Sequence, residues 1–171
     1  MVSPTKIDLN RMKILQGNIC GLRAAGKKDR VLQKLDAGKY DICCLQETFI
    51  SQGQSENISM KPYYMYHRER DNDGSQNRGG VTIGVLDTGK WIHQKVHVSP
   101  VGCLVETITV TVGTPDGGEL IYVTSMYIRP GVKLEIQELR DALPLNIIPE
   151  DAKWIICTDA NAHIRAWDAH M

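Results

Sequence analysis

Four polar residues each stand at the carboxyl end of a segment whose apolar pattern predicts a buried β-strand. They are Asn18, Glu47, Tyr127 and Asp159. In α/β proteins ligands bind off such strand ends, because loops and helix N-termini converge there while the strands fix the geometry. Each residue alone also fits a structural role, as a turn residue or a core tyrosine. Their shared position favours a single functional site.

The residue types suit metal-assisted hydrolysis of a phosphoester. A hard divalent cation prefers carboxylate and amide oxygens and keeps positions open for water and a phosphate oxygen. We therefore expect Glu47 and Asn18 to serve a metal site. On an extended segment Asp159 and Asn161, two residues apart, would point the same way and hold the attacking water and the phosphate. Tyr127 would donate a hydrogen bond to the charge developing on the phosphate.

Hydrophobic periodicity predicts the elements that position these residues. Residues 12–19 and 40–46 have the pattern of buried strands, and the helical spacing over 27–39 joins them into a β-α-β unit with parallel strands. A second amphipathic helix is predicted over 134–143, with Leu134, Ile136, Leu139 and Leu143 on or near one face. Further strands are predicted at 62–68, 79–86, 91–98, 103–112, 119–127 and 153–159. The alternation in "VETITVTV" predicts one core face and one more polar face.

This order of elements predicts a layered α-β-β-α sandwich of two mixed sheets. A chain of 171 residues fits one domain. We assign residues 12–171 to that domain and residues 1–11 to a flexible N-terminus.

The formal net charge is zero, so no overall field attracts a polyanion and a nucleic-acid ligand would need local basic patches. Two such patches occur, and solvated surface is the alternative for both. The first holds Arg23, Lys27, Lys28 and Arg30, and the second holds Arg68, Arg70 and Arg78. We expect Arg23 and Arg78 to contact substrate.

The five cysteines form no CxxC pair, and Cys43, Cys44 and Cys157 lie in apolar runs. We expect free thiols, a reducing intracellular compartment and no thiolate-bound zinc. The N-terminus lacks a signal-peptide segment, and no apolar run approaches the ~20 residues of a membrane span.

Five motifs, "QGNICGL", "CLQETF", "RGGVTIGV", "SMYIRP" and "TDANAHIRAWD", occur in this order. Together they resemble the endonuclease/exonuclease/phosphatase family, and most closely the apurinic-like endonuclease domain of non-LTR retrotransposons. The resemblance implies Mg²⁺ or Mn²⁺ at Asn18 and Glu47, and a DNA target nicked for reverse transcription in the nucleus. It assigns further site roles to Tyr127, Asp159, Asn161, His163, Trp167 and Asp168.

Two departures from the family pattern affect these expectations. The last motif has Thr158 and Ala160 where the family has glycine and phenylalanine around the same aspartate. The family pattern also continues to further strands, a second aspartate and a Ser-Asp-His motif, which this sequence lacks. We therefore expect weak or absent nicking, and a sheet edge covered by a homodimer partner or an exchanged segment.

Three alternatives remain open at the level of sequence. The same fold and metal site serve phosphoesterases that act on lipid or nucleotide phosphates. A domain that kept the fold and lost the chemistry would be a non-catalytic nucleic-acid-binding or assembly module. A third reading takes Asp159, His163, Asp168 and His170 as a transition-metal cluster, although their spacing matches no ligand motif.

Overall fold

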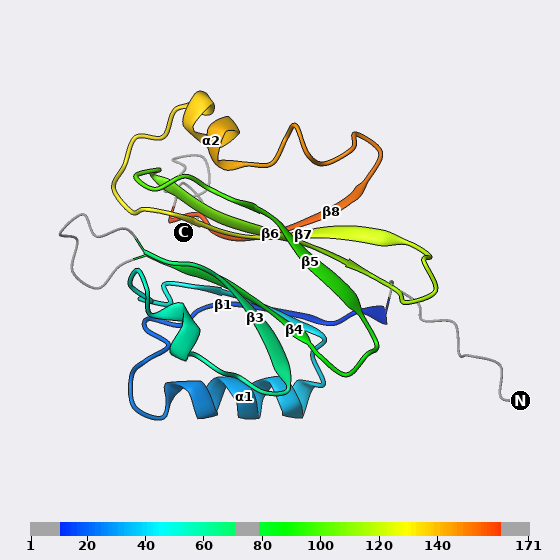
Figure 1. Ribbon diagram of the computed structural model, residues 1–171. Coiled ribbons are helices and arrows are strands. Elements are labelled where there is room, and N and C mark those ends of the chain that lie inside the picture. The colour runs from blue at the N-terminus through cyan, green and yellow to red at the C-terminus, as the bar shows by residue number, and fades with distance from the viewer. Residues whose placement is uncertain (1–10, 71–78, 162–171) are drawn as a thin grey trace, which may run out of the picture.

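The computed structural model describes residues 11–70 and 79–161. Two four-stranded sheets face each other, with one helix outside each sheet (Figure 1). The first sheet has the order β1 (Ile14–Asn18), β2 (Ile42–Gln46), β4 (Val81–Leu86) and β3 (Tyr63–Arg68). The second has the order β5 (Ile92–Val98), β6 (Val105–Gly113), β7 (Leu120–Ile128) and β8 (Lys153–Asp159). The helices are α1 (Lys27–Gly38) and α2 (Ile136–Ala142), and a short 3-10 helix, η2, spans Ser55–Asn57.

Three apolar clusters separate these layers. Ile83 and Val123 belong to the cluster between the two sheets. Leu35 belongs to the cluster beneath α1, and Ala142 to the cluster beneath α2. The strand pairs β1–β2 and β7–β8 are parallel and the other pairs are antiparallel. The predicted α-β-β-α sandwich of two mixed sheets is confirmed.

Strand β6 differs from its predicted half-polar character, since all its residues are buried. The hydroxyl of Thr107 donates to the carbonyl of Ala142 in α2, and the hydroxyls of Thr109 and Thr124 lie 2.7 Å apart. Helix α2 and strand β7 therefore contact the threonine face of β6. The alternation of the sequence had predicted a more polar environment for this face.

Helix α2 is shorter than predicted. A capping box between Glu135 and Glu138 starts it at Ile136, whose side chain is 74% exposed. The prediction that Ile136 joins the apolar face is therefore wrong, whereas Leu139 does pack beneath the helix. Within the described ranges neither helix is long and apolar enough to cross a membrane.

Strands β1 and β8 form the edges of their sheets on the same side of the molecule. Ile155 and Ile156 of β8 are 40% and 41% exposed, although the sequence predicted a buried strand. An apolar run cannot reveal whether a strand has one neighbour or two, so it predicted the strand but not its place at the edge.

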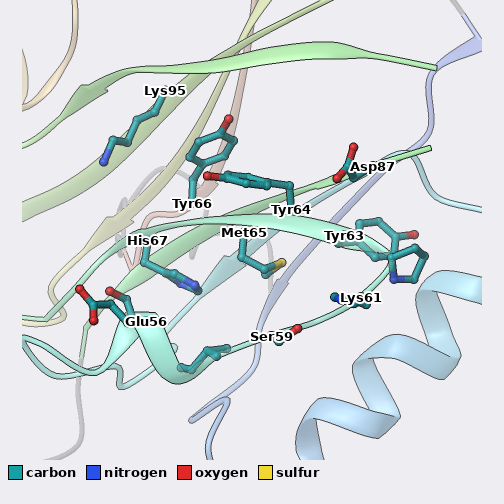
Figure 2. Close-up of a pocket in the computed structure, with 13 residues that line it drawn as sticks. Glu56, Ser59, Lys61, Tyr63, Tyr64, Met65, Tyr66, His67, Asp87 and Lys95 are labelled. Atoms are coloured by element: carbon teal, nitrogen blue, oxygen red, sulfur yellow. The ribbon is translucent and has the colours of Figure 1, made fainter. Parts of the chain in front are cut away.

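The opposite edge of the first sheet is β3. Tyr64 and Tyr66 lie on one side of this strand, and Met65 and His67 lie on the other (Figure 2). The hydroxyl of Tyr66 lies 2.9 Å from Nδ1 of His93 and so links β3 to β5. A cavity of about 810 Å³ runs along this edge, and none of the predicted site residues line it.

Candidate active site

The carboxyl ends of β1 and β2 bring Asn18 and Glu47 together. Asn18 lies opposite Gln46 in the parallel ladder, one residue before Glu47. The backbone N–H of Gly21 donates to the carbonyl of Glu47 at 2.7 Å, which joins the two loops beyond the strands. The two predicted metal ligands therefore lie side by side at one end of the first sheet.

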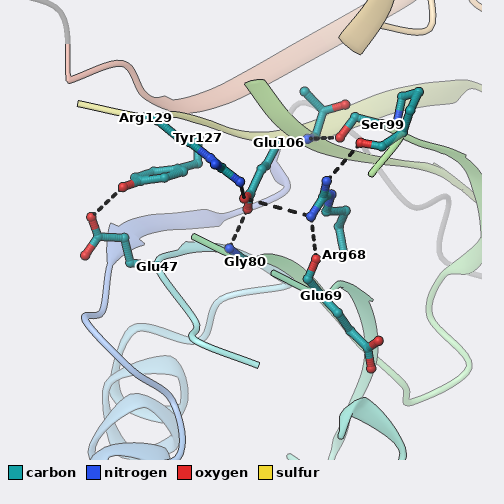
Figure 3. Close-up of polar contacts among 10 residues, drawn as sticks. Glu47, Arg68, Glu69, Gly80, Ser99, Glu106, Tyr127 and Arg129 are labelled. Carbon is teal, nitrogen blue, oxygen red and sulfur yellow. Dashed lines mark hydrogen bonds and ion pairs between the residues drawn. The ribbon is translucent and has the colours of Figure 1, made fainter. Parts of the chain in front are cut away.

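The second sheet contributes Tyr127 and Asp159, which are partners in the β7–β8 ladder. Two hydrogen bonds connect them to the first sheet. Nδ2 of Asn18 donates to Oδ2 of Asp159 at 2.7 Å. The hydroxyl of Tyr127 donates to Oε1 of Glu47 at 2.9 Å (Figure 3). The four strand-end residues thus form one cluster between the two sheets.

Backbone strain is concentrated at this cluster. Glu47 has a φ of 51°, and Cys20 and Phe49 have values of 49° and 55°. Residues other than glycine rarely adopt this left-handed backbone conformation. Such residues cluster at functional sites, where surrounding contacts hold the strained backbone in place. The chain turns sharply at Glu47 because β2 has ended, and this turn lets its carboxylate face Tyr127.

Tyr127 is fully buried, and its hydroxyl contacts Glu47. Burial raises the pKa of its hydroxyl above the usual range, and the hydrogen bond to Glu47 raises that pKa further. Tyr127 therefore remains protonated at neutral pH and acts as a permanent donor to the Glu47 carboxylate. Donation from this hydroxyl to the phosphate, which the sequence predicted, stays a prediction.

Asn161 departs from the extended geometry expected of it. β8 ends at Asp159, and Asn161 has a φ of 43°. Its Nδ2 donates to the backbone carbonyl of Ile128 at 3.1 Å, which ties the end of β8 to the end of β7. Asn161 lies near the cluster. The prediction that it would do so rested on an extended segment from Asp159 to Asn161, and this segment is not extended at Asn161.

Gln46 is a site residue that the sequence analysis missed. Its buried side chain accepts a hydrogen bond from Gln16 at 2.9 Å and donates to Ser125 Oγ at 3.0 Å. It therefore links β1, β2 and β7 directly beneath Glu47. A glutamine at the end of the apolar run "YDICCLQ" was the available signal.

A groove of about 880 Å³ adjoins Glu47 and carries two arginines, Arg23 and Arg70. Arg23 donates to Oε1 of Gln54, and Nε of Arg70 donates to Ser51 Oγ at 3.0 Å. Arg68, which was grouped with Arg70 in a surface patch, is instead 3% exposed and pairs with Glu106. Its neighbours in the sequence are polar, but β3 turns this side chain inward.

Four of the predicted site residues lie outside the described residues, namely Arg78, His163, Trp167 and Asp168. Most of the predicted flexible N-terminus and the histidines of the alternative metal cluster also lie outside them. In the ranges that are described, no group of three or more histidines, cysteines or acidic residues could hold a metal ion. The donors present at the cluster are the carboxylates of Glu47 and Asp159 and the amide oxygen of Asn18. An oxygen-only set fits Mg²⁺ or Mn²⁺ better than zinc.

Residues 15–171 match the Endonuclease/Exonuclease/phosphatase family over most of the sequence. The chain belongs to this family. Members of the endonuclease/exonuclease/phosphatase family generally use divalent metals, which agrees with the oxygen donors of the cluster. No curated protein sequence matches the chain.

Solved structures share the fold at low sequence identity. D. rerio TDP2 complexed with a single-strand DNA product is 15% identical with a TM-score of 0.58, over 92% of this chain and 64% of that one. The Xenopus laevis APE2 catalytic domain is 18% identical with a TM-score of 0.57, over 88% and 59%. A Bacteroides thetaiotaomicron mannosyl-6-phosphatase is 11% identical with a TM-score of 0.61, over 90% and 67%. The chain thus spans about two thirds or less of these family structures, and its neighbours are nucleases and phosphatases.

Replacing Tyr127 with phenylalanine tests its contact with Glu47. The change keeps the buried ring and removes the donor, so we expect Mn²⁺ affinity to fall roughly 10- to 100-fold, as for other residues that orient a metal ligand. Titration followed by electron paramagnetic resonance of free Mn²⁺ measures this change. Tyr122→Phe, at the other end of β7, serves as the control. Equal affinities in both variants would show that Tyr127 does not orient the ligand.

Proposed function

We propose that this chain is a metal-dependent DNA endonuclease domain of the retrotransposon type, which nicks DNA in the nucleus. The observation that carries the proposal is the pair of hydrogen bonds between the sheets, Asn18 to Asp159 and Tyr127 to Glu47. They join oxygen donors from four strand ends beside an arginine-bearing groove.

Each residue of the cluster has a distinct role in this proposal. Glu47 and Asn18 would hold Mg²⁺ or Mn²⁺, which when bound stabilises negative charge on the phosphate oxygens. Asn18 fixes one carboxylate oxygen of Asp159, and the other can accept a proton from the attacking water. Tyr127 holds Glu47 in place. The water oxygen forms the new P–O bond, and the oxygen of the broken P–O bond takes a proton from solvent and leaves as the hydroxyl end of the nicked strand.

The groove supports a polyanionic substrate. Arg23 and Arg70 line the same groove as Glu47, so a phosphodiester at the cluster would have further backbone phosphates within reach of cations. Arginine is suited to phosphate contacts because its planar guanidinium can donate two parallel hydrogen bonds. A small phosphate monoester at the cluster would not need these arginines, which would then serve only their contacts with Gln54 and Ser51.

A substrate panel tests the proposal. The purified chain is incubated with Mg²⁺ or Mn²⁺ and supercoiled plasmid, mannose 6-phosphate, a nucleoside monophosphate or a phosphoinositide. We expect only weak metal-dependent nicking of plasmid, and we expect it to weaken further as salt rises because cation contacts to phosphates are screened. Turnover of a monoester without nicking would favour another phosphoesterase. DNA binding without any hydrolysis would favour a non-catalytic module.

We also propose that a second copy of the chain covers the β8 edge. An antiparallel pairing of two β8 strands centred on Ile156 would place Lys153 of each copy opposite Asp159 of the other. Ile155 and Ile156 would lie in the middle of this pairing and lose their exposure. The strand is therefore complementary to itself in apolar character.

Light scattering after size exclusion tests this pairing. We expect a concentration-dependent dimer, and we expect Ile155→Lys to shift it to monomer because a charged side chain would enter the paired edge. Ile147→Lys changes a comparably exposed isoleucine outside β8, at 48% exposure, and should leave the dimer intact. A wild-type chain that stays monomeric at high concentration would exclude the pairing.

A further inference from the structure

A carboxylate with no solvent exposure lies behind the proposed active site. Glu106 of β6 is 0% exposed. It accepts a hydrogen bond from the backbone N–H of Gly80, and its Oε1 lies 3.4 Å from Nη2 of Arg129 and 3.8 Å from Nη1 of Arg68 (Figure 3). Burying a charge is costly unless partners compensate it, and here two guanidinium groups do so.

One side of Glu106 holds the loop that contains Glu47. Gly79 and Gly80 both have a φ of 82°, and a Cβ on Gly79 would lie 2.6 Å from Oε1 of Glu106. The carbonyls of these glycines accept hydrogen bonds from the N–H groups of Phe49 and Thr48, each at 3.1 Å. Glu106 is thus connected through the glycine pair to the two residues that immediately follow Glu47.

The other side of Glu106 leads to Glu47 through Tyr127. Glu106 and Tyr127 are directly opposed in the β6–β7 ladder. Arg129 lies two residues beyond Tyr127, so the two side chains fall on the same face of the extended chain, and Arg129 pairs with Glu106. Tyr127 in turn donates to Oε1 of Glu47. Glu106 is therefore linked to both supports of Glu47, to the loop backbone through Gly80 and to Tyr127 as its partner in the β6–β7 ladder.

We propose that Glu106 is a positioning residue that sets the orientation of the Glu47 carboxylate toward its divalent ion. This inference rests on the proposed metal-dependent function. A purely structural ion pair would change the stability of the fold and leave the intrinsic metal affinity of the folded protein unaltered. A positioning role changes the affinity even where the fold persists. It also accounts for the first glycine of "RGG", since a side chain at Gly79 would displace the Glu106 carboxylate.

The test compares Glu106→Gln with Asp41→Asn. Asp41 is a matched buried carboxylate, 5% exposed, that accepts hydrogen bonds from Lys90 at 2.6 Å and from Trp91 at 3.1 Å. It precedes β2 and therefore lies at the end of the sheet opposite Glu47. Both variants should lower the melting temperature. Only Glu106→Gln should weaken Mn²⁺ binding of the folded protein, roughly tenfold, as measured by resonance of the free ion.

The Mn²⁺ affinities of these variants decide whether Glu106 orients Glu47. Wild-type Mn²⁺ affinity in a folded Glu106→Gln variant, or an equal loss in Asp41→Asn, would overturn the inference. If Glu106→Gln does not fold, Arg129→Gln perturbs the same carboxylate from a partly exposed position and should weaken Mn²⁺ binding in the same direction. An unchanged affinity in that folded variant would also overturn the inference. If the wild-type chain binds no Mn²⁺, the proposed metal-dependent function fails instead.

Discussion

Replacing Glu47 with glutamine is expected to abolish Mn²⁺ binding and to lower single-turnover DNA cleavage by roughly 10³-fold, or about 4 kcal/mol. Glutamine has the shape of glutamate and can still accept the hydrogen bond from Tyr127. The change therefore removes the negative charge that attracts the cation and keeps the local packing. Cleavage is measured with protein in excess, and Mn²⁺ binding gives a second measurement that does not depend on turnover.

Glu119→Gln is the matched control for this variant. Glu119 is an exposed carboxylate that accepts a hydrogen bond from Nζ of Lys153 at 2.7 Å, beside the end of β8 opposite the cluster. Its loss should affect neither metal binding nor cleavage, because an exposed ion pair contributes little. If Glu47→Gln bound Mn²⁺ as tightly as Glu119→Gln, the assignment of Glu47 as a metal ligand would be wrong.

Replacing Asp159 with asparagine should lower the cleavage rate by roughly 10² to 10⁴, the usual contribution of a positioned acid or base. Asparagine can keep a hydrogen bond with Asn18 but cannot accept a proton from water at neutral pH. We expect kcat to fall with KM nearly constant, because the interaction that is lost forms mainly in the transition state. Mn²⁺ affinity should change far less than in Glu47→Gln.

Asp151→Asn, in the exposed turn before β8, provides the control for general effects of the substitution. It should leave both kcat and Mn²⁺ affinity unchanged. Parallel losses of metal affinity and rate in Asp159→Asn would show that Asp159 is a metal ligand and not the residue that accepts the proton.

The cluster could be predicted from the sequence because local signals coincide there. Asn18 and Glu47 end two strands of one β-α-β unit, whose parallel pairing places both carboxyl ends at the same edge. Tyr127 and Asp159 end the parallel pair on either side of α2 in the same way. Polarity after an apolar run was therefore enough to place these residues together.

The burial of the charged residues Arg68 and Glu106 could not be predicted from the sequence. Their charged partners lie on other strands, and local sequence patterns do not predict which strands lie next to each other. Arg68 ends the predicted strand 62–68 next to a polar segment, and Glu106 approaches from β6 to compensate its charge in the interior. The exposure of β8 was missed for a similar reason. An apolar segment has the same composition whether one or both of its edges are paired.

The hydrogen bond between Asn18 and Asp159 joins residues separated by 141 positions. Closing so long a loop costs chain entropy, and contacts between residues so distant in the sequence slow folding. During translation, therefore, the amino-terminal part of the chain exists for a time without its catalytic partner. A ribosome-bound chain that has not yet released β8 lacks the contact between Asn18 and Asp159, so the cluster is assembled only after that strand has been synthesised and has paired.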